Sequence, residues 1–248
     1  MHLPKRQRGF FPRSDAATRS LVWLALAASL LCGPVSGMAG QAGAASIDDD
    51  SRSVSEWIRT TGDNKALAFA IIDKKTATVH VFDRFGTKLA SSPVLLGLAI
   101  GDASVPGIGE RKMSQIRPEE RTTPAGRFIT EPGVNLEGKD IVWIDYDAAV
   151  SMHRVVTANK AERRLERLAT PGVADKRISY GCVNVPAAFY DTYIKPAFGS
   201  QPAMVYVLPE TSEASAFFHI GDEAPTTLAA GKPLSDVSEA SGLPGAAD

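Results

Sequence analysis

Short apolar runs of strand length recur along the chain between residues 67 and 208, and turn residues separate them. Residues 67–72 form one continuous run, residues 78–82 alternate between apolar and polar, and residues 93–100 form another apolar stretch. Runs of this length, bounded by Gly, Pro and Asp, are typical of β-strands. The domain is therefore predicted to begin as a β-meander.

The rest of the domain mixes further strands with short helices. Strands are predicted over residues 127–130, 141–146 and 203–208, and helices near residues 53–58, 160–169 and 186–198. The last helix carries Pro at its first turn, where a missing N–H costs little. Residues 101–126 are rich in Gly, Pro and charge, which predicts a long functional loop. Together these patterns predict a β-rich α+β fold.

The first 45 residues differ from the rest. Five basic residues precede an apolar run of 11 residues at 21–31, and small residues follow up to position 45. This order is typical of a secretory signal. The run is shorter than the roughly 20 residues that span a bilayer. We expect export to the periplasm or cell envelope, with no stable membrane span after cleavage; an uncleaved anchor is the alternative.

Export changes the charge and the cysteine count of the chain. Removing residues 1–45 leaves a net charge near −5, and a nucleic-acid partner is not expected because it usually needs a basic face. Cys32 also leaves, so Cys182 would be the sole cysteine of the mature protein. Because exported proteins usually pair their cysteines, a single thiol suggests a function.

The segment around Cys182 suits a nucleophile. Gly181 lets the backbone approach a substrate closely, and the positive end of the helix predicted from Pro186 favours a thiolate, which is the reactive form. The alternative is a buried cysteine that packs as a small apolar residue.

A base for Cys182 is found by elimination among four histidines. His2 lies in the signal, His80 lies inside a predicted strand and His219 lies in the tail. His153 follows a predicted strand and precedes a loop, where catalytic residues often lie. One plausible histidine and one cysteine are too few for a zinc site, so no metal is expected.

Two motifs resemble those of the L,D-transpeptidase family with the YkuD-type catalytic domain. One is Ser179-Tyr180-Gly181-Cys182-Val183-Asn184 with His153 upstream, and the other is Thr123-Pro124-Ala125-Gly126-Arg127-Phe128. The resemblance covers roughly residues 67–208. It implies a mixed β-sheet or sandwich with a few short helices, and no cofactor.

The resemblance also implies a mechanism. Cys182 would be the nucleophile, His153 the base, and the backbone carbonyl of Arg154 would orient the imidazole. The substrates would be peptidoglycan stem peptides: the cysteine attacks the carbonyl of the third residue, releases D-alanine and passes the acyl group to an amine. Carbapenem-type compounds are the expected inhibitors.

The chain departs from the family pattern at three places. Tyr180 replaces a common histidine, and Arg154 stands where a small residue is common. Twenty-five residues separate His153 from Ser179, more than is typical, and the predicted helix at 160–169 accounts for the excess. Its basic residues would attract substrate carboxylates, or they form a solvated face.

Four residues near Cys182 are candidates for substrate or oxyanion contacts. Ser179 would bond near the histidine or stabilise the turn, and Tyr180 would line the pocket or offer its N–H. Gly181 would allow close approach, and Asn184 would orient substrate or cap the next helix.

The predicted division is a signal (1–45), a segment with a short helix (46–66), a catalytic domain (67–208) and a mostly disordered tail (209–248). Acyl transfer is the first hypothesis for function. Hydrolysis by the same acyl-enzyme, as an L,D-carboxypeptidase or endopeptidase, is a variant of it. A non-catalytic wall-binding module is an alternative of a different class.

Overall fold

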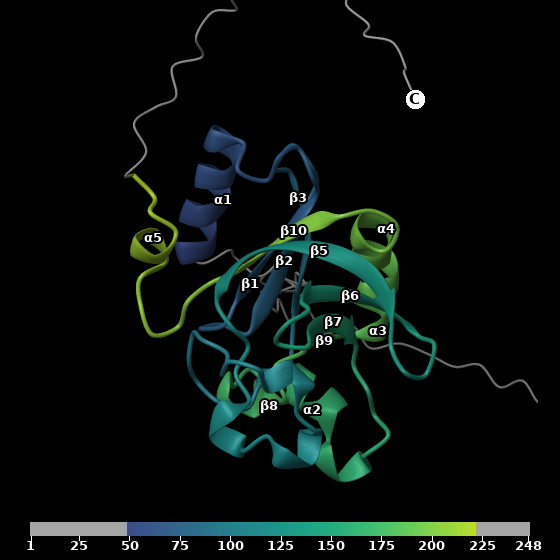
Figure 1. The fold of residues 1–248 in the computed structure, drawn as a ribbon. Coiled ribbons are helices and arrows are strands. Elements are labelled where there is room, and N and C mark those ends of the chain that lie inside the picture. Colours follow the sequence, from purple (N-terminus) through teal and green to yellow (C-terminus); the bar gives the residue numbers. More distant parts are fainter. Residues whose placement is uncertain (1–48, 222–248) are drawn as a thin grey trace, which may run out of the picture. The chain divides into compact units, whose positions relative to one another are not determined.

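A computed structural model describes residues 49–221, so the predicted signal lies outside the described residues (Figure 1). The strands are β1 Phe69–Asp73, β2 Thr78–Phe82, β3 Lys88–Pro93, β4 Leu96–Gly97, β5 Gly126–Val134, β6 Asp140–Asp145, β7 Val150–Arg154, β8 Arg177–Ser179, β9 Val183–Val185 and β10 Ala203–Val207. The helices are α1 Asp49–Thr61, α2 Arg164–Ala169, α3 Ala187–Phe189, α4 Lys195–Phe198 and α5 Ala214–Phe217; a π-helical segment, Tyr190–Ile194, joins α3 to α4.

Eight strands form one mixed sheet in the order β3-β2-β1-β10-β5-β6-β7-β9, and β4 pairs with β8 beside it. The long strand β5 pairs with β10 through its first half and with β6 through its second half. Strands from both halves of the sheet bury side chains in the same core: Ala70, Val79 and Val205 pack in one cluster with Val142, Met152 and Val183. The predicted β-rich α+β fold, with a mixed sheet and a few short helices, is confirmed.

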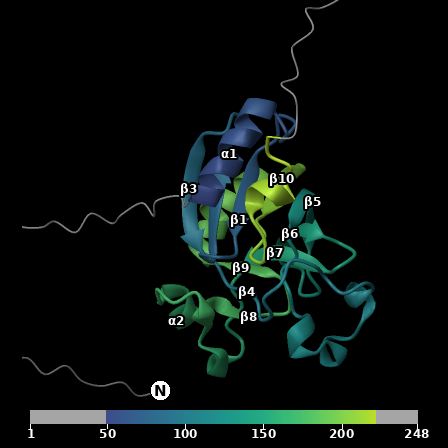
Figure 2. The same cartoon turned by 90° about the vertical axis from the view of Figure 1, so that its left-hand side faces the viewer.

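A second core lies between the sheet and the helices α1 and α5. Figure 2 shows α1 lying across the strands β1 and β10. Val54, Trp57 and Ile58 recur at helical spacing and form the buried face of α1. Phe218, just after α5, stacks on Trp57 with ring centroids 6.2 Å apart. The chain beyond β10 is therefore packed against the domain as far as Ile220.

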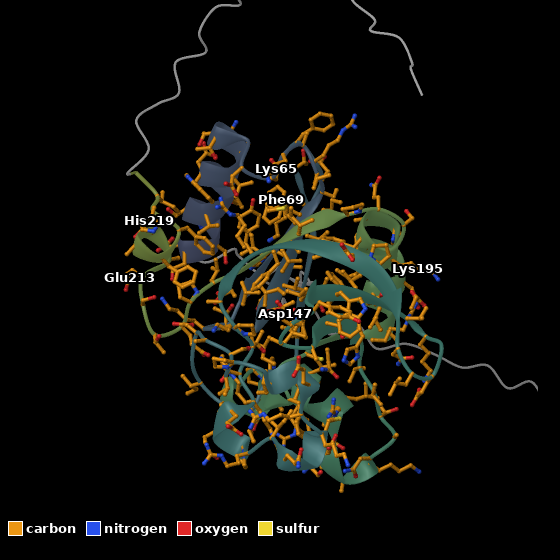
Figure 3. The ribbon with its side chains drawn as sticks, viewed as in Figure 1. Lys65, Phe69, Asp147, Lys195, Glu213 and His219 are labelled. Carbon is orange, nitrogen blue, oxygen red and sulfur yellow. The ribbon has the colours of Figure 1, made fainter. Side chains whose placement is uncertain are left out.

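The exposure of individual side chains to solvent differs widely across the domain, and Figure 3 labels examples. Phe69 in β1 is fully buried, whereas His219 after α5 is exposed. His80 is buried within β2, as expected of a structural histidine.

No helix within residues 49–221 is long and apolar enough to cross a membrane.

The predicted third strand at residues 93–100 is wrong in position. The third strand of the meander is β3, which ends at Pro93, and beyond Pro93 only Leu96–Gly97 of the apolar stretch is a strand. The sequence of β3 gives little signal because it lies at an edge of the sheet and buries only Ser92. The apolar stretch instead lies beside the segment that contains Cys182 and Asn184. The backbones of Leu95 and Asn184 exchange two hydrogen bonds of 2.9 Å.

Two predicted helices also differ from the structure. The first begins at Asp49, so Ser53 and Glu56 lie inside α1 and form no capping box at its start. The helix predicted at 160–169 is divided at Arg163, whose φ of 49° is left-handed, into a 3₁₀ turn and α2. As predicted, residues 101–125 form a loop; it contains three 3₁₀ turns.

Candidate active site

Two short parallel strands, β7 and β9, bring the predicted site residues together. Their register places Met152 opposite Val183 and His153 opposite Asn184. Successive side chains of a strand point to opposite faces. Met152 and Val183 are fully buried in the core, so His153 and Asn184 point to the other face.

The same alternation places Ser151 and Cys182 on the face of His153 and Asn184. The Ser151 hydroxyl and the Cys182 Sγ lie 3.7 Å apart, and Sγ also lies 3.7 Å from the carbonyl oxygen of Ala149. The side chains of Cys182 and His153 lie close enough for each to shift the pKa of the other. Cys182 is half-buried, and it is a free cysteine.

The backbone orients the imidazole of His153. Its Nδ1 lies 2.8 Å from the carbonyl oxygen of Arg154. Because a carbonyl oxygen can only accept a hydrogen bond, Nδ1 carries the proton in the neutral ring. Nε2 is therefore the nitrogen that is available to the Cys182 thiol.

The two side chains shift each other's proton affinity. Burial by itself would raise the pKa of Cys182, but the interactions with His153 and with Ser151 together outweigh it and hold the pKa below its usual value. Burial would lower the pKa of His153, but the interactions with Cys182 and with the Arg154 carbonyl together outweigh it and the pKa is raised. The pair therefore favours a thiolate beside an imidazolium, which is the reactive state of such a cysteine.

Hydrogen bonds around the Cys182 carbonyl hold the turn that carries the nucleophile. The Ser179 hydroxyl donates to this carbonyl at 2.6 Å and accepts from the Gly181 N–H at 3.1 Å. Asn184 Nδ2 donates to the same carbonyl at 3.3 Å. Ser179 thus stabilises the turn. Asn184 lies within β9 and does not cap α3, whose N-cap is Pro186.

Gly181 occupies a position that a larger residue cannot fill. Its φ is +132°, and a Cβ there would lie 2.9 Å from the carbonyl oxygen of Thr122. The Thr123 hydroxyl donates to the Gly181 carbonyl at 2.8 Å and accepts from the Gly97 N–H at 2.8 Å. The two motifs of the sequence therefore meet at this turn.

Replacing Gly181 by alanine is expected to destabilise the protein by about 1–3 kcal/mol, because it combines a strained φ with a contact on Thr122. Urea unfolding would measure the loss. Gly138→Ala is the matched control, since Gly138 also has a positive φ (74°) but has no atom within 4 Å of the place that an added methyl group would take. Equal losses in the two variants would contradict a role for the Thr122 contact.

Tyr180 and Arg154, two of the departures from the family pattern, each have charged partners in the structure. Arg121 of the long loop lies over the Tyr180 ring, 3.9 Å from its centroid, and donates to the Ile116 carbonyl, so this loop is attached to the nucleophile turn. The Arg154 guanidinium turns away from the site and pairs with Asp140 and Asp191.

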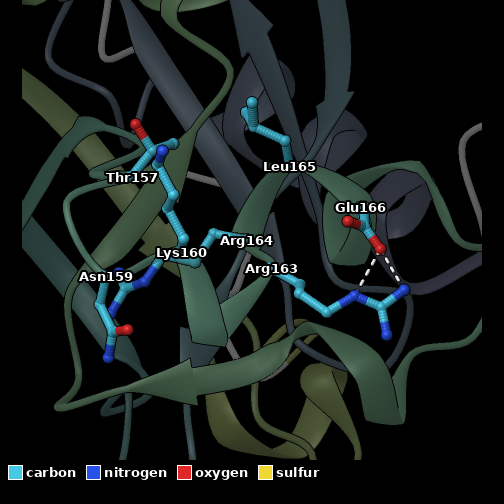
Figure 4. A pocket seen from close by; sticks show the side chains of 7 residues that line it. All are labelled: Thr157, Asn159, Lys160, Arg163, Arg164, Leu165 and Glu166. Carbon is cyan, nitrogen blue, oxygen red and sulfur yellow. Dashed lines mark hydrogen bonds and ion pairs between the residues drawn. The ribbon is translucent and has the colours of Figure 1, made fainter.

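The extra segment between β7 and β8 contributes a residue that the motifs did not indicate (Figure 4). A cavity of about 220 Å³ is lined by residues that include Lys160, Arg163 and Arg164. Arg163 is exposed and pairs with Glu166. Arg164 is mostly buried and donates to Asn184 Oδ1 at 2.7 Å, which places it at the site. Within residues 49–221, no cluster of three or more His, Cys, Asp or Glu could hold a metal ion.

No protein-family model and no curated protein matches the sequence. Solved structures do match. The structure of LD transpeptidase LdtMt1 in complex with imipenem is 16% identical, with 57% of this chain and 58% of that chain covered and a TM-score of 0.32. An L,D-transpeptidase from Mycobacterium smegmatis is 16% identical, with 56% and 58% covered and a TM-score of 0.31.

A third match is the helical cell shape determining protein Pgp2 from Campylobacter jejuni. It is 13% identical, with 66% of this chain and 58% of that chain covered and a TM-score of 0.40. The chain thus spans about three fifths of the length of these structures. The described part of this chain is similar in fold to solved L,D-transpeptidase structures at low sequence identity.

Proposed function

We propose that this chain is an exported cysteine L,D-transpeptidase that acts on peptidoglycan stem peptides in the periplasm or cell envelope. The observation that carries the proposal is the pairing of β7 with β9, which brings His153 beside Cys182 while the Arg154 carbonyl holds the imidazole. A base that is itself oriented by a third group is the arrangement that activates a nucleophile for acyl transfer.

In the proposed reaction, the Cys182 thiolate attacks a stem-peptide carbonyl and forms a tetrahedral oxyanion. The imidazolium of His153 gives its proton to the departing amine, and a thioester remains on Cys182. An amine of a second stem then attacks the thioester, His153 takes its proton, and the thiolate leaves. The oxyanion needs N–H donors. The Gly181 N–H is bonded to Ser179, so we assign this role to the neighbouring Tyr180 N–H.

Hydrolysis is the close alternative, because water that reaches the same thioester gives a carboxypeptidase or endopeptidase. A wall-binding module without catalysis would need a sealed or unreactive Cys182. The half-buried thiol with a lowered pKa favours the enzyme over that module.

The proposal is tested by mass spectrometry of the folded protein after incubation with a carbapenem. We expect one covalent adduct, located on Cys182, and none in the Cys182→Ala variant. Incubation with a disaccharide-tetrapeptide then separates the outcomes: a cross-linked dimer indicates transfer, and free D-alanine with no dimer indicates hydrolysis. Folded wild-type protein that forms no adduct and turns over no tetrapeptide would overturn the proposal.

A further inference from the structure

We propose that Arg164 is a positioning residue for the nucleophile, because its guanidinium fixes the side-chain amide of Asn184 in the orientation that supports the Cys182 carbonyl. This inference rests on the proposed use of Cys182 as a nucleophile. It concerns the segment between β7 and β8, which lies outside both sequence motifs.

Asn184 is a buried link between two parts of the chain. Its side-chain amide has an accepting end and a donating end, and the structure uses both: Oδ1 accepts from Arg164 at 2.7 Å and Nδ2 donates to the Cys182 carbonyl at 3.3 Å. Asn184 is only 1% exposed, so water does not readily replace either partner.

The two partners of Asn184 together allow one orientation of its amide. A guanidinium has only donors and a carbonyl has only an acceptor. In the reversed orientation, the amide nitrogen would face the Arg164 guanidinium and Oδ1 would face the Cys182 carbonyl oxygen, so both contacts would be repulsive. Removing Arg164 takes away the partner that selects the orientation, and it leaves a buried Oδ1 without that donor.

The guanidinium of Arg164 is itself held in place. Its Nε donates to Glu162 at 2.5 Å, and only 14% of its side chain is exposed. The side chain of the neighbouring Arg163 is 70% exposed, and it pairs with Glu166 (Figure 4). The two adjacent arginines therefore have different surroundings, and Arg163 provides a matched control.

Support of the Cys182 carbonyl bears on the geometry of attack. This carbonyl belongs to the peptide that joins the nucleophile to β9, and its donors are Ser179 and Asn184. A displacement of about 1 Å at a reacting group can cost on the order of 100-fold in rate. A loosened turn is therefore expected to lower the rate of attack by Cys182 strongly and to change substrate affinity little.

The test measures the rate of Cys182 alkylation by iodoacetamide across pH, which needs no peptidoglycan substrate. We expect Arg164→Leu to slow alkylation, Arg164→Lys to recover part of the rate because a donor is restored, and Arg163→Leu to leave the rate unchanged. With tetrapeptide substrate, kcat should fall by about 10- to 100-fold in Arg164→Leu and KM should stay constant. Alkylation results remain valid if transpeptidation is absent, so the two proposals can fail separately.

A double-mutant cycle separates positioning from a direct effect of the Arg164 charge. If Arg164 acts through Asn184, Arg164→Leu should cost little further in an Asn184→Ala background, whereas a charge effect would cost the same in both backgrounds. Asn184→Asp keeps the acceptor for Arg164 and removes the donor to Cys182, so it should lose rate while α2 stays attached. Additive losses, or an Arg164→Leu rate equal to wild type, would overturn the inference.

Discussion

Replacing His153 by alanine is expected to lower kcat/KM for acyl transfer by about 10²- to 10⁴-fold, which is the usual contribution of a positioned base. The reason is visible in the pKa of Cys182. Burial alone would raise this pKa, and the hydrogen bond and charge of His153 hold it down. Without the imidazole, only the weaker effect of Ser151 opposes burial, so the thiol should stay protonated to a higher pH.

The pH dependence of Cys182 alkylation measures this change without a substrate. In wild type, the thiolate should form below the usual thiol pKa, and in His153→Ala the profile should shift to higher pH with a slower reaction at pH 7. His219→Ala is the control, because this exposed histidine lies after α5 and outside the site. A His153→Ala profile that overlays the wild-type profile would contradict the assigned base.

Replacing Lys74 by methionine is expected to destabilise the protein by about 3–5 kcal/mol, the usual cost of breaking a buried ion pair. The Lys74 side chain is 0% exposed, and its ammonium donates to Asp102 at 2.7 Å and to the carbonyl oxygens of Gly101 and Thr123. Glu210 lies 3.5 Å away. Methionine fills similar space but removes one donor from these carboxylates and carbonyls while leaving them buried.

Lys75→Met is the matched control for Lys74→Met. Lys75 is adjacent but partly exposed, and it pairs with Asp50. Surface pairs of this kind contribute about 0–1 kcal/mol. Urea unfolding of both variants should therefore show a loss several times larger for Lys74→Met, and equal losses would contradict the buried role of Lys74.

The same cluster predicts an acid dependence of stability. Burial would raise the pKa of Asp102, but hydrogen bonds from Lys74, Thr211 and nearby backbone outweigh it and lower the pKa from 3.8 to about 2. A lowered carboxyl pKa contributes stability above the unfolded value, and this stability is lost as the pH falls from about 4 towards 2. In Lys74→Met the folded-state pKa of Asp102 should lie closer to its unfolded value, so the stability lost over this pH range should be smaller. Because Lys74 also bonds Thr123, whose hydroxyl holds Gly181, the cluster supports the nucleophile turn as well.

Local sequence patterns determined the residue types of the candidate site and the class of the fold. Cys182 is the one cysteine outside the predicted signal, and His153 is the candidate base that remains once the other histidines are set aside. The β-rich pattern also predicted β2 over its full length and the long loop before β5. These features depend on composition, spacing and turn residues, which are local properties of the chain.

The strands that carry the site were not predicted, because their alternation of apolar and polar residues extends over too few positions to stand out from the flanking loops. In β7, Ser151 and His153 alternate with core residues, and β9 is three residues long with Asn184 at its centre. Their parallel pairing joins segments 31 residues apart and has no local signal. The pairing nevertheless decides that these side chains share one face with Cys182.

Adjacent residues of equal charge also acquired different roles only through the tertiary structure. Lys74 and Lys75, like Arg163 and Arg164, have similar chemistry in the sequence. In the structure, one member of each pair is largely buried among hydrogen-bond acceptors and the other is more exposed. Burial depends on which distant segments pack around a side chain, so the sequence determined which groups were present and the packing decided which of them bear on the nucleophile.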